Sequence, residues 1–192
     1  MTALKNCPSC GRPIDFEEKY ARILACGYCN SILEFGTWEL SKIWEQWEFI
    51  DFPSEFIVWK TIEWKWQKVY VKGQLRYEYD WWFFDKFFVI IDWKEFYINE
   101  DDWSQKLLQD WKWQNSSEWL LDKPVWETIS LFWKEIFVQE SGLFKLSSMK
   151  GYINSELIPW KEYEYLDWAI DWKMYYFEKV IWDDKVRVNK EV

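Results

Sequence analysis

Apolar and polar residues alternate along much of the chain with the two-residue period of β-strands. The stretch LRYEYDWWFFDKFFVIIDWKEFYI (75–98) shows this rhythm. The segments KVYVKGQLRYEY (68–79) and KEIFVQESGLFKL (134–146) are rich in β-branched and aromatic residues. Turn-forming residues interrupt such runs at spacings of roughly 8–12 residues, which is typical of small barrels and sandwiches. The pattern therefore predicts a mainly β protein.

Two pairs of similar segments indicate a tandem repeat within this β region. VWKTIEWKWQKVYV (58–71) matches VWETISLFWKEIFV (125–138), and DWKEFYI (92–98) matches DWKMYYF (171–177). The members of the second pair are further apart than those of the first. We therefore place an insertion in the second copy, around SSMKGYINSELIP (147–159).

The predicted organisation has one small N-terminal module followed by two β-units. The segment TWELSKIWEQWEF (37–49) suits a short helix with Thr37 as its N-cap. The module spans 1–36, and a linker at 37–54 contains the segment that suits the helix. A first small β-barrel or sandwich unit spans 55–110, a second linker 111–124, and a second, related unit 125–192.

All four cysteines lie in the N-terminal module, as CPSC and CGYC, which is the four-thiolate zinc pattern. We predict a zinc ribbon at 1–36, in which each Cys-x-x-Cys turn places two sulfurs on one ion, and Gly11 and Gly27 suit these turns. Four thiolates leave no open position, so the Zn²⁺ is structural and supplies the folding energy that so short a module lacks. Two disulfides or a redox Cys-x-x-Cys are the alternatives. The predicted ligands are Cys7, Cys10, Cys26 and Cys29.

Composition and charge exclude several kinds of function. The chain has 192 residues, a net charge of −9 and no histidine. The missing histidine excludes His-based acid–base catalysis and His-ligated metals, and the acidic charge argues against binding a phosphate backbone. The first 20 residues lack the apolar core of a signal peptide. No run reaches the roughly 20 apolar residues of a membrane span, so we expect a cytoplasmic protein.

Tryptophan is abundant where turns need glycine. The chain has 19 tryptophans and six glycines, although glycine is ordinarily about 7% of residues. Six aspartates are followed directly by tryptophan, and no aspartate or asparagine is followed by glycine. Tight hairpins favour Asp-Gly or Asn-Gly because their central residues need positive φ, which a bulky side chain resists.

We interpret many of these tryptophans as glycines that were decoded wrongly. The codon UGA is read as tryptophan in one alternative genetic code and as glycine in another, and Trp119 is expected to be genuine. The other interpretations are a buried tryptophan core and an aromatic surface that binds carbohydrate or a membrane interface. The candidate glycine positions are Trp59, Trp66, Trp81, Trp82, Trp93, Trp126, Trp133, Trp160, Trp168, Trp172 and Trp182.

Three stretches carry a family resemblance. They are CPSCG…CGYCNS in the ribbon, VWKTIEWKWQKVYVKGQLRYEY (58–79), and GYINSELIPWKEYEYLD (151–167). When glycine is read at the candidate tryptophan positions, they resemble domain-of-unknown-function family 4178 preceded by a zinc ribbon. The chain departs from the family's Trp-x-Glu-Tyr or Trp-x-Glu-Trp motif, which is here FFDKF (83–87). The resemblance implies no established activity, and it suggests an accessory role beside membrane-stress proteins.

The function that we predict is a non-enzymatic adaptor that binds a protein partner, with sheet edges available for strand addition. An enzyme built on carboxylates is one alternative, with the pairs Asp101-Asp102 and Asp183-Asp184 as candidates. Nucleic-acid binding through the ribbon is another. The ribbon's basic and acidic residues balance, so this role is unfavourable.

Overall fold

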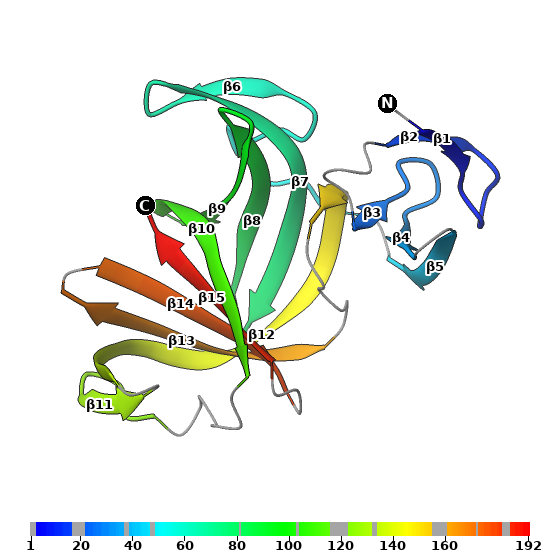
Figure 1. The fold of residues 1–192 in the computed structure, drawn as a ribbon. Helices are drawn as coiled ribbons and strands as arrows, with labels where there is room; N and C mark the ends of the chain where they lie inside the picture. The colour runs from blue at the N-terminus through cyan, green and yellow to red at the C-terminus, as the bar shows by residue number, and fades with distance from the viewer. Residues whose placement is uncertain are drawn as a thin grey trace.

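The computed structural model shows an all-β protein (Figure 1). It describes residues 3–16, 22–36, 39–46, 49–80, 82–102, 104–115, 123–131, 134–154, 161–171, 173–181 and 185–192. All regular secondary structure in these residues is β-strand, which confirms the predicted class. No helix among them is long and apolar enough to cross a membrane.

The strands fall into an N-terminal group, β1–β5, and a larger group, β6–β15. The first group comprises β1 (Ala3–Asn6), β2 (Pro13–Phe16), β3 (Ile23–Ala25), β4 (Ser31–Phe35) and β5 (Leu40–Glu45). The second group comprises β6 (Thr61–Trp64), β7 (Gln67–Tyr79), β8 (Trp82–Ile91), β9 (Lys94–Asp101), β10 (Ser104–Asn115), β11 (Thr128–Leu131), β12 (Lys134–Ile153), β13 (Glu162–Ile170), β14 (Lys173–Val180) and β15 (Lys185–Glu191).

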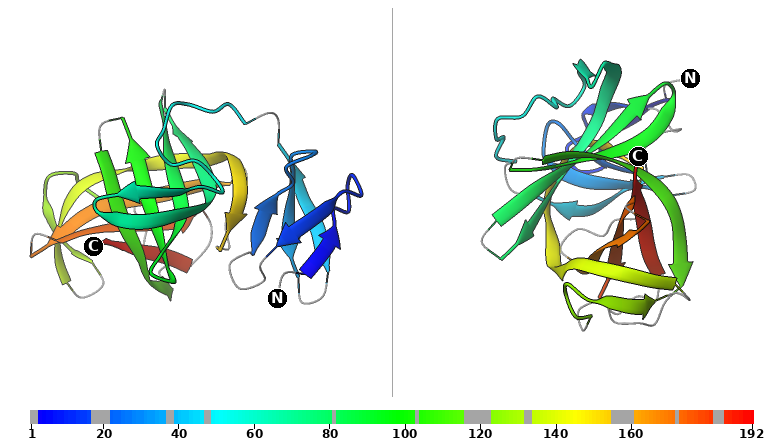
Figure 2. Two further views of the ribbon diagram at one scale, coloured as in Figure 1. Left: turned by 90° about the horizontal axis from the view of Figure 1, so that it is seen from above. Right: turned by 90° about the vertical axis from the view of Figure 1, so that its left-hand side faces the viewer.

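Eight strands of the larger group close into an antiparallel barrel (Figures 1 and 2). Their order is β7-β8-β9-β10-β15-β14-β13-β12, and β12 pairs again with β7. β6 and β11 stand outside this ring, each in a hairpin with the strand that follows it. Closure pairs every long strand on both sides, which removes the exposed edges that an open sheet would have.

The two predicted β-units are the two halves of this one barrel. β6–β10 lie in the first unit and β11–β15 in the second, and each unit contributes four strands to the ring. Two separate small barrels are therefore not formed, because β7 pairs with β12 and β10 with β15 across the units. The predicted linker at 111–124 also begins too early, since β10 continues to Asn115.

β12 is the strand that joins the barrel to the N-terminal group. It has 20 residues against 13 in β7, and it pairs in turn with β13, β7 and β3. The extra length falls in the predicted insertion, where Tyr152 and Ile153 pair with Leu24 and Ile23. The helix considered at 37–49 is wrong, because this segment contains β5, which pairs with β4.

The crossing of β7 and β12 requires two genuine glycines. A Cβ added at Gly73 would lie 2.1 Å from the carbonyl oxygen of Tyr152. A Cβ at Gly151, whose φ is +74°, would lie 2.3 Å from the carbonyl oxygen of Lys72. Both distances are far below van der Waals contact, so any side chain here would push β7 and β12 apart where they pair.

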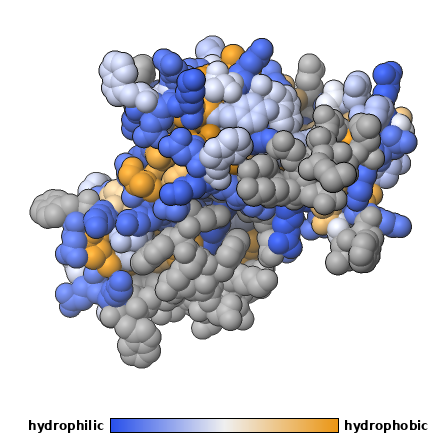
Figure 3. Space-filling model, turned by 45° about the horizontal axis from the view of Figure 1, so that its top comes forward, coloured by the Kyte–Doolittle hydropathy of each residue, from blue (hydrophilic) through white to orange (hydrophobic). Residues whose placement is uncertain are grey.

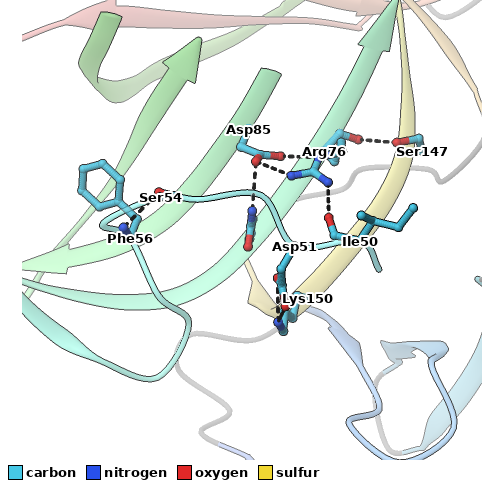
Figure 4. A network of polar contacts seen from close by, with 9 residues as sticks. Ile50, Asp51, Ser54, Phe56, Arg76, Asp85, Ser147 and Lys150 are labelled. Carbon is cyan, nitrogen blue, oxygen red and sulfur yellow. Dashed lines mark hydrogen bonds and ion pairs between the residues drawn. The ribbon is translucent and has the colours of Figure 1, made fainter. Parts of the chain in front are cut away.

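The segment between β5 and β6 is held on the barrel by a buried ion pair (Figure 4). Arg76 donates from Nε to Asp85 Oδ1 at 2.9 Å and from Nη2 to Asp85 Oδ2 at 2.6 Å, and both side chains are buried. Its Nη1 donates to the carbonyl oxygen of Ile50, and its guanidinium lies over the rings of Phe49 and Phe52. One side chain thus fixes the path of the chain from ribbon to barrel.

Several tryptophans occupy backbone positions that favour glycine. Trp59, Trp66, Trp93 and Trp126 have φ between 64° and 70°. Of the other candidate positions, Trp82 and Trp168 lie inside strands β8 and β13. The remaining candidates, Trp81, Trp133, Trp160, Trp172 and Trp182, and also Trp119, lie outside the described residues.

Candidate metal centre

Two turns of the same design carry the four cysteines. In the first, between β1 and β2, the N–H of Gly11 donates to the carbonyl of Cys7 at 2.9 Å. In the second, between β3 and β4, the N–H of Asn30 donates to the carbonyl of Cys26 at 2.9 Å. Gly11 and Asn30 have φ of 72° and 56°, so the left-handed residue of the second turn is Asn30 and not Gly27. Asparagine is among the few residues with a side chain that tolerate this region.

The sulfurs are spaced for one tetrahedral ion. All four lie within 4.8 Å of one another. Cys7 Sγ is 3.8 Å from Cys29 Sγ, and Cys10 Sγ is 3.9 Å from Cys26 Sγ. Four sulfurs at metal–sulfur distances of about 2.3 Å would stand roughly 3.8 Å apart in a tetrahedron. A disulfide needs about 2.05 Å, so the geometry fits a metal ion and leaves the cysteines free of disulfides.

The pKa values of the thiols differ within the cluster. Burial raises the pKa of Cys26 to about 12. For Cys29, burial also raises the pKa, but hydrogen bonds with the side chain and backbone of Ser31 outweigh it and bring the pKa to about 7. Cys29 Sγ lies 3.3 Å from Ser31 Oγ. A metal ion that binds all four as thiolates must therefore displace protons.

The cluster is part of the core that joins ribbon and barrel. Cys7 and Cys26 pack in one hydrophobic cluster with Leu24 and Leu33 of the ribbon and with Tyr152 of β12. Two further ribbon residues of β3 and β4, Ile23 and Ile32, pack instead in the barrel core. The side chain of Gln46 adds a pair of hydrogen bonds to the backbone of Met149, at 2.6 and 2.8 Å. A metal ion here would thus support the barrel as well as the ribbon.

Of the two acidic pairs singled out from the sequence, the structure describes only Asp101-Asp102, and its two members have different surroundings. Asp101 lines a cavity at one mouth of the barrel, whereas Asp102 is exposed in the turn after β9. Asp183 and Asp184 lie outside the described residues. Asp167, which lines the same cavity, was not predicted from the sequence, because the residues of the other unit that line this cavity meet it only in the closed barrel.

Two buried charge networks on opposite faces of β8 were also not predicted from the sequence. Asp85 pairs with Arg76 on one face, and Lys86 donates to Glu178 on the other. Arg187 Nη1 lies 3.9 Å from Glu178 Oε2. Both networks use the FFDKF segment (83–87), which therefore carries a buried charge on each face of β8.

Comparison of the chain with protein-family models, with curated proteins and with solved structures finds no match. The site therefore has to be interpreted from its own geometry.

Proposed function

We propose that the four cysteines hold a structural Zn²⁺ and that the protein is a non-enzymatic adaptor of the cytoplasm. Four sulfur donors in a tetrahedral arrangement favour zinc or iron over hard cations. A closed set of four thiolates offers no position for a substrate, and free thiolates suit a reducing compartment. The resemblance to family 4178 supports a partner among membrane-stress proteins, by association alone.

A groove between the ribbon and the barrel supports binding of a partner protein. It has a volume of about 530 Å³ and is lined by residues of the second cysteine turn, by Trp59 and by the end of β12. Tyr28 stands between two metal ligands at its rim and is 63% exposed, with Arg12 stacked 5.1 Å from its ring centre. Tyrosine, tryptophan and arginine are the residues that most often dominate protein interfaces.

The outer surface supports this choice of groove. On the face shown in Figure 3, hydrophobic residues gather in small separate groups among hydrophilic ones. Such scattered groups are normal for a surface that binds nothing. Compared with the coloured residues of this face, the groove is the better candidate for a partner's anchoring side chain.

Tyr28→Ala is expected to abolish retention of the specific partner by the tagged protein in its source cell. The exposed ring contributes little to folding, but loss of an interface anchor typically costs about 2 kcal/mol or more, which is at least tenfold in affinity. Quantitative affinity capture compares this variant with the wild type. Phe137→Ala, which removes an exposed ring on the barrel, serves as the control. Equal capture by Tyr28→Ala and the wild type contradicts the proposed groove.

We also propose that several tryptophan positions hold glycine in the protein as its source cell makes it, and that the barrel halves arose by duplication. Lys65-Trp66 and Asp92-Trp93 are two-residue hairpin loops in which both residues have positive φ. This is the type I′ geometry that favours Asn-Gly or Asp-Gly. Trp66 and Trp93 are 103% and 84% exposed, so the indoles gain almost nothing from packing.

The intact mass of the protein from its source cell is expected to fall below the mass calculated with 19 tryptophans. Each glycine in place of tryptophan lowers the mass by the same step, so the deficit counts the glycines.

In the chain made as written, Trp93→Gly should raise the free energy of unfolding by about 1 kcal/mol, because it relieves backbone strain. Trp64→Gly removes a buried ring that donates to Gln105 and should cost about 3 kcal/mol or more. For the protein from its source cell, an intact mass equal to the value calculated with 19 tryptophans refutes the decoding proposal.

A further inference from the structure

The mouth of the barrel that lies away from the ribbon contains a cavity of about 100 Å³. The ribbon joins the barrel near Gly73, in the middle of β7, whereas Tyr79, the last residue of β7, lines the cavity. This volume suits a molecule of a few heavy atoms, well below the roughly 300 Å³ at which sites for drug-sized ligands begin. The cavity shares no lining residue with the metal centre or with the groove beside it.

Carboxylates outnumber cations on the cavity wall. Four carboxylates line it, against the single ammonium of Lys106. Glu178 is also engaged by Lys86 behind the wall. The lining carboxylates are Asp101, Glu140, Asp167 and Glu178. An anionic ligand would meet this charge unfavourably, so the wall selects for a cation.

Two buried acceptors in the wall lack donors. Asn99 Oδ1 and Glu178 Oε2 are buried and have no hydrogen-bond partner among the described residues. Glu178 is only 7% exposed, and its Oε2 has Arg187 Nη1 no closer than 3.9 Å. Leaving a buried acceptor without a donor typically costs about 1–3 kcal/mol. Both residues line the cavity, so its wall holds acceptor capacity that the described part of the protein leaves unused.

Aromatic rings form the rest of the wall. Phe144 stands 5.7 Å from Tyr165 and 5.7 Å from Phe84, between ring centres. Lys106 already places its ammonium 5.3 Å from the ring centre of Tyr176. Ring faces attract cations and also cover the alkyl part of an organic ligand.

A metal ion does not fit this wall. Within the described ranges, the four cysteines are the one group of three or more possible ligands whose donor atoms lie close enough to share an ion. No three of the cavity carboxylates therefore have donor atoms close enough to share one metal ion. From the negative wall, the orphan acceptors and the rings, we propose that this cavity binds a small organic ammonium that carries N–H donors.

The pH dependence follows from the groups that face Asp167. Burial raises the pKa of Asp167 to about 7, with Glu140 of β12 and Glu178 of β14 adding to the rise and Lys106 of β10 and Lys86 of β8 opposing it. On β9, burial and Asp102 also raise the pKa of Asp101. Both carboxyls lose protons as the pH rises, so binding of an ammonium tightens as the pH rises through about 7.

The test is a titration of the full chain with butylammonium, followed by NMR or calorimetry at pH 8. Butylammonium should bind, and Asp167→Asn should weaken it at least tenfold, as expected when a charged hydrogen bond is lost. Asp171→Asn, in the exposed turn that follows the same strand, should leave binding unchanged. The amide keeps the shape of Asp167 and removes a buried charge, so the variant remains folded.

Two probes of similar size separate the proposal from its rivals. Butan-1-ol has the same length without the charge, and tetramethylammonium has the charge without N–H donors. Both should bind at least tenfold more weakly than butylammonium. Equal binding of either probe, unchanged binding to Asp167→Asn, or no binding of butylammonium overturns the proposal. None of these outcomes bears on the metal centre or on the groove.

Discussion

Removing the metal ion with a competing chelator is expected to unfold the ribbon and to destabilise the barrel. The ribbon core is small and is built around Cys7 and Cys26. In zinc-finger peptides the bound ion supplies an apparent 10–16 kcal/mol, roughly. Without it, the backbone amides of β3 and β4 should lose their protection from hydrogen exchange.

The barrel should lose stability as well, because it shares a core with the ribbon. Ile23 and Ile32 cover part of the barrel core, and Tyr152 of β12 packs in the ribbon. Loss of two buried isoleucine contacts alone is worth about 3 kcal/mol. Urea unfolding of the barrel, with and without the chelator, measures this loss.

Two variants define the controls for metal removal. Cys26→Ala should reproduce the effect of the chelator, because it removes one ligand of the site. Ser9→Ala lies in the first cysteine turn but is exposed and donates no ligand, so it should behave as the wild type. If the chelator leaves the exchange protection of β3 and β4 unchanged, the ribbon does not depend on a metal.

Arg76→Ala is expected to destabilise the protein by about 3–5 kcal/mol, the usual cost of leaving a buried charge without its partner. The variant leaves Asp85 with Gln74 Nε2 as its remaining donor, at 3.0 Å. It also removes the hydrogen bond to the carbonyl oxygen of Ile50. It also removes the cation that lies 4.5 Å from the ring centre of Phe83. Urea unfolding monitored by circular dichroism measures the change.

Lys150→Ala is the matched control for Arg76→Ala. Lys150 pairs with Asp51 at 2.8 Å and so ties the same segment to β12, but both side chains are substantially exposed (Figure 4). Exposed pairs contribute about 1 kcal/mol at most. The double variant Arg76→Ala/Asp85→Ala should recover part of the loss, because it removes the stranded charge. Equal effects of Arg76→Ala and Lys150→Ala would show that burial of the pair is not what matters.

Local patterns in the sequence were enough to predict the β class, the turns and the cysteine cluster. Alternation predicted the β class because successive side chains of a strand face opposite sides. The cysteine spacing predicted that the four thiols meet, since each Cys-x-x-Cys turn is a local structure and only two turns had to come together. The unusual turns were also visible, because Asp-Trp stands where Asp-Gly is expected, as at Asp92-Trp93.

Contacts between distant segments could not be predicted in this way. The pairing of β10 with β15 and of β7 with β12 decides that there is one barrel, and no local pattern encodes it. The same holds for Lys86 and Glu178, which meet only inside the closed barrel. In β5, Leu40, Ile43 and Trp44 have helical spacing, but pairing with β4 overrides it.

The most direct test of the central claim is the metal content of the purified protein. Native mass spectrometry of the chain, prepared without chelators, should show one zinc ion per chain, and alkylation should modify none of the four cysteines until the metal is removed. A metal-free chain with freely alkylated cysteines would contradict a structural zinc ion that holds the ribbon against the barrel. So would a chain that is lighter by the hydrogen atoms lost when two disulfides form.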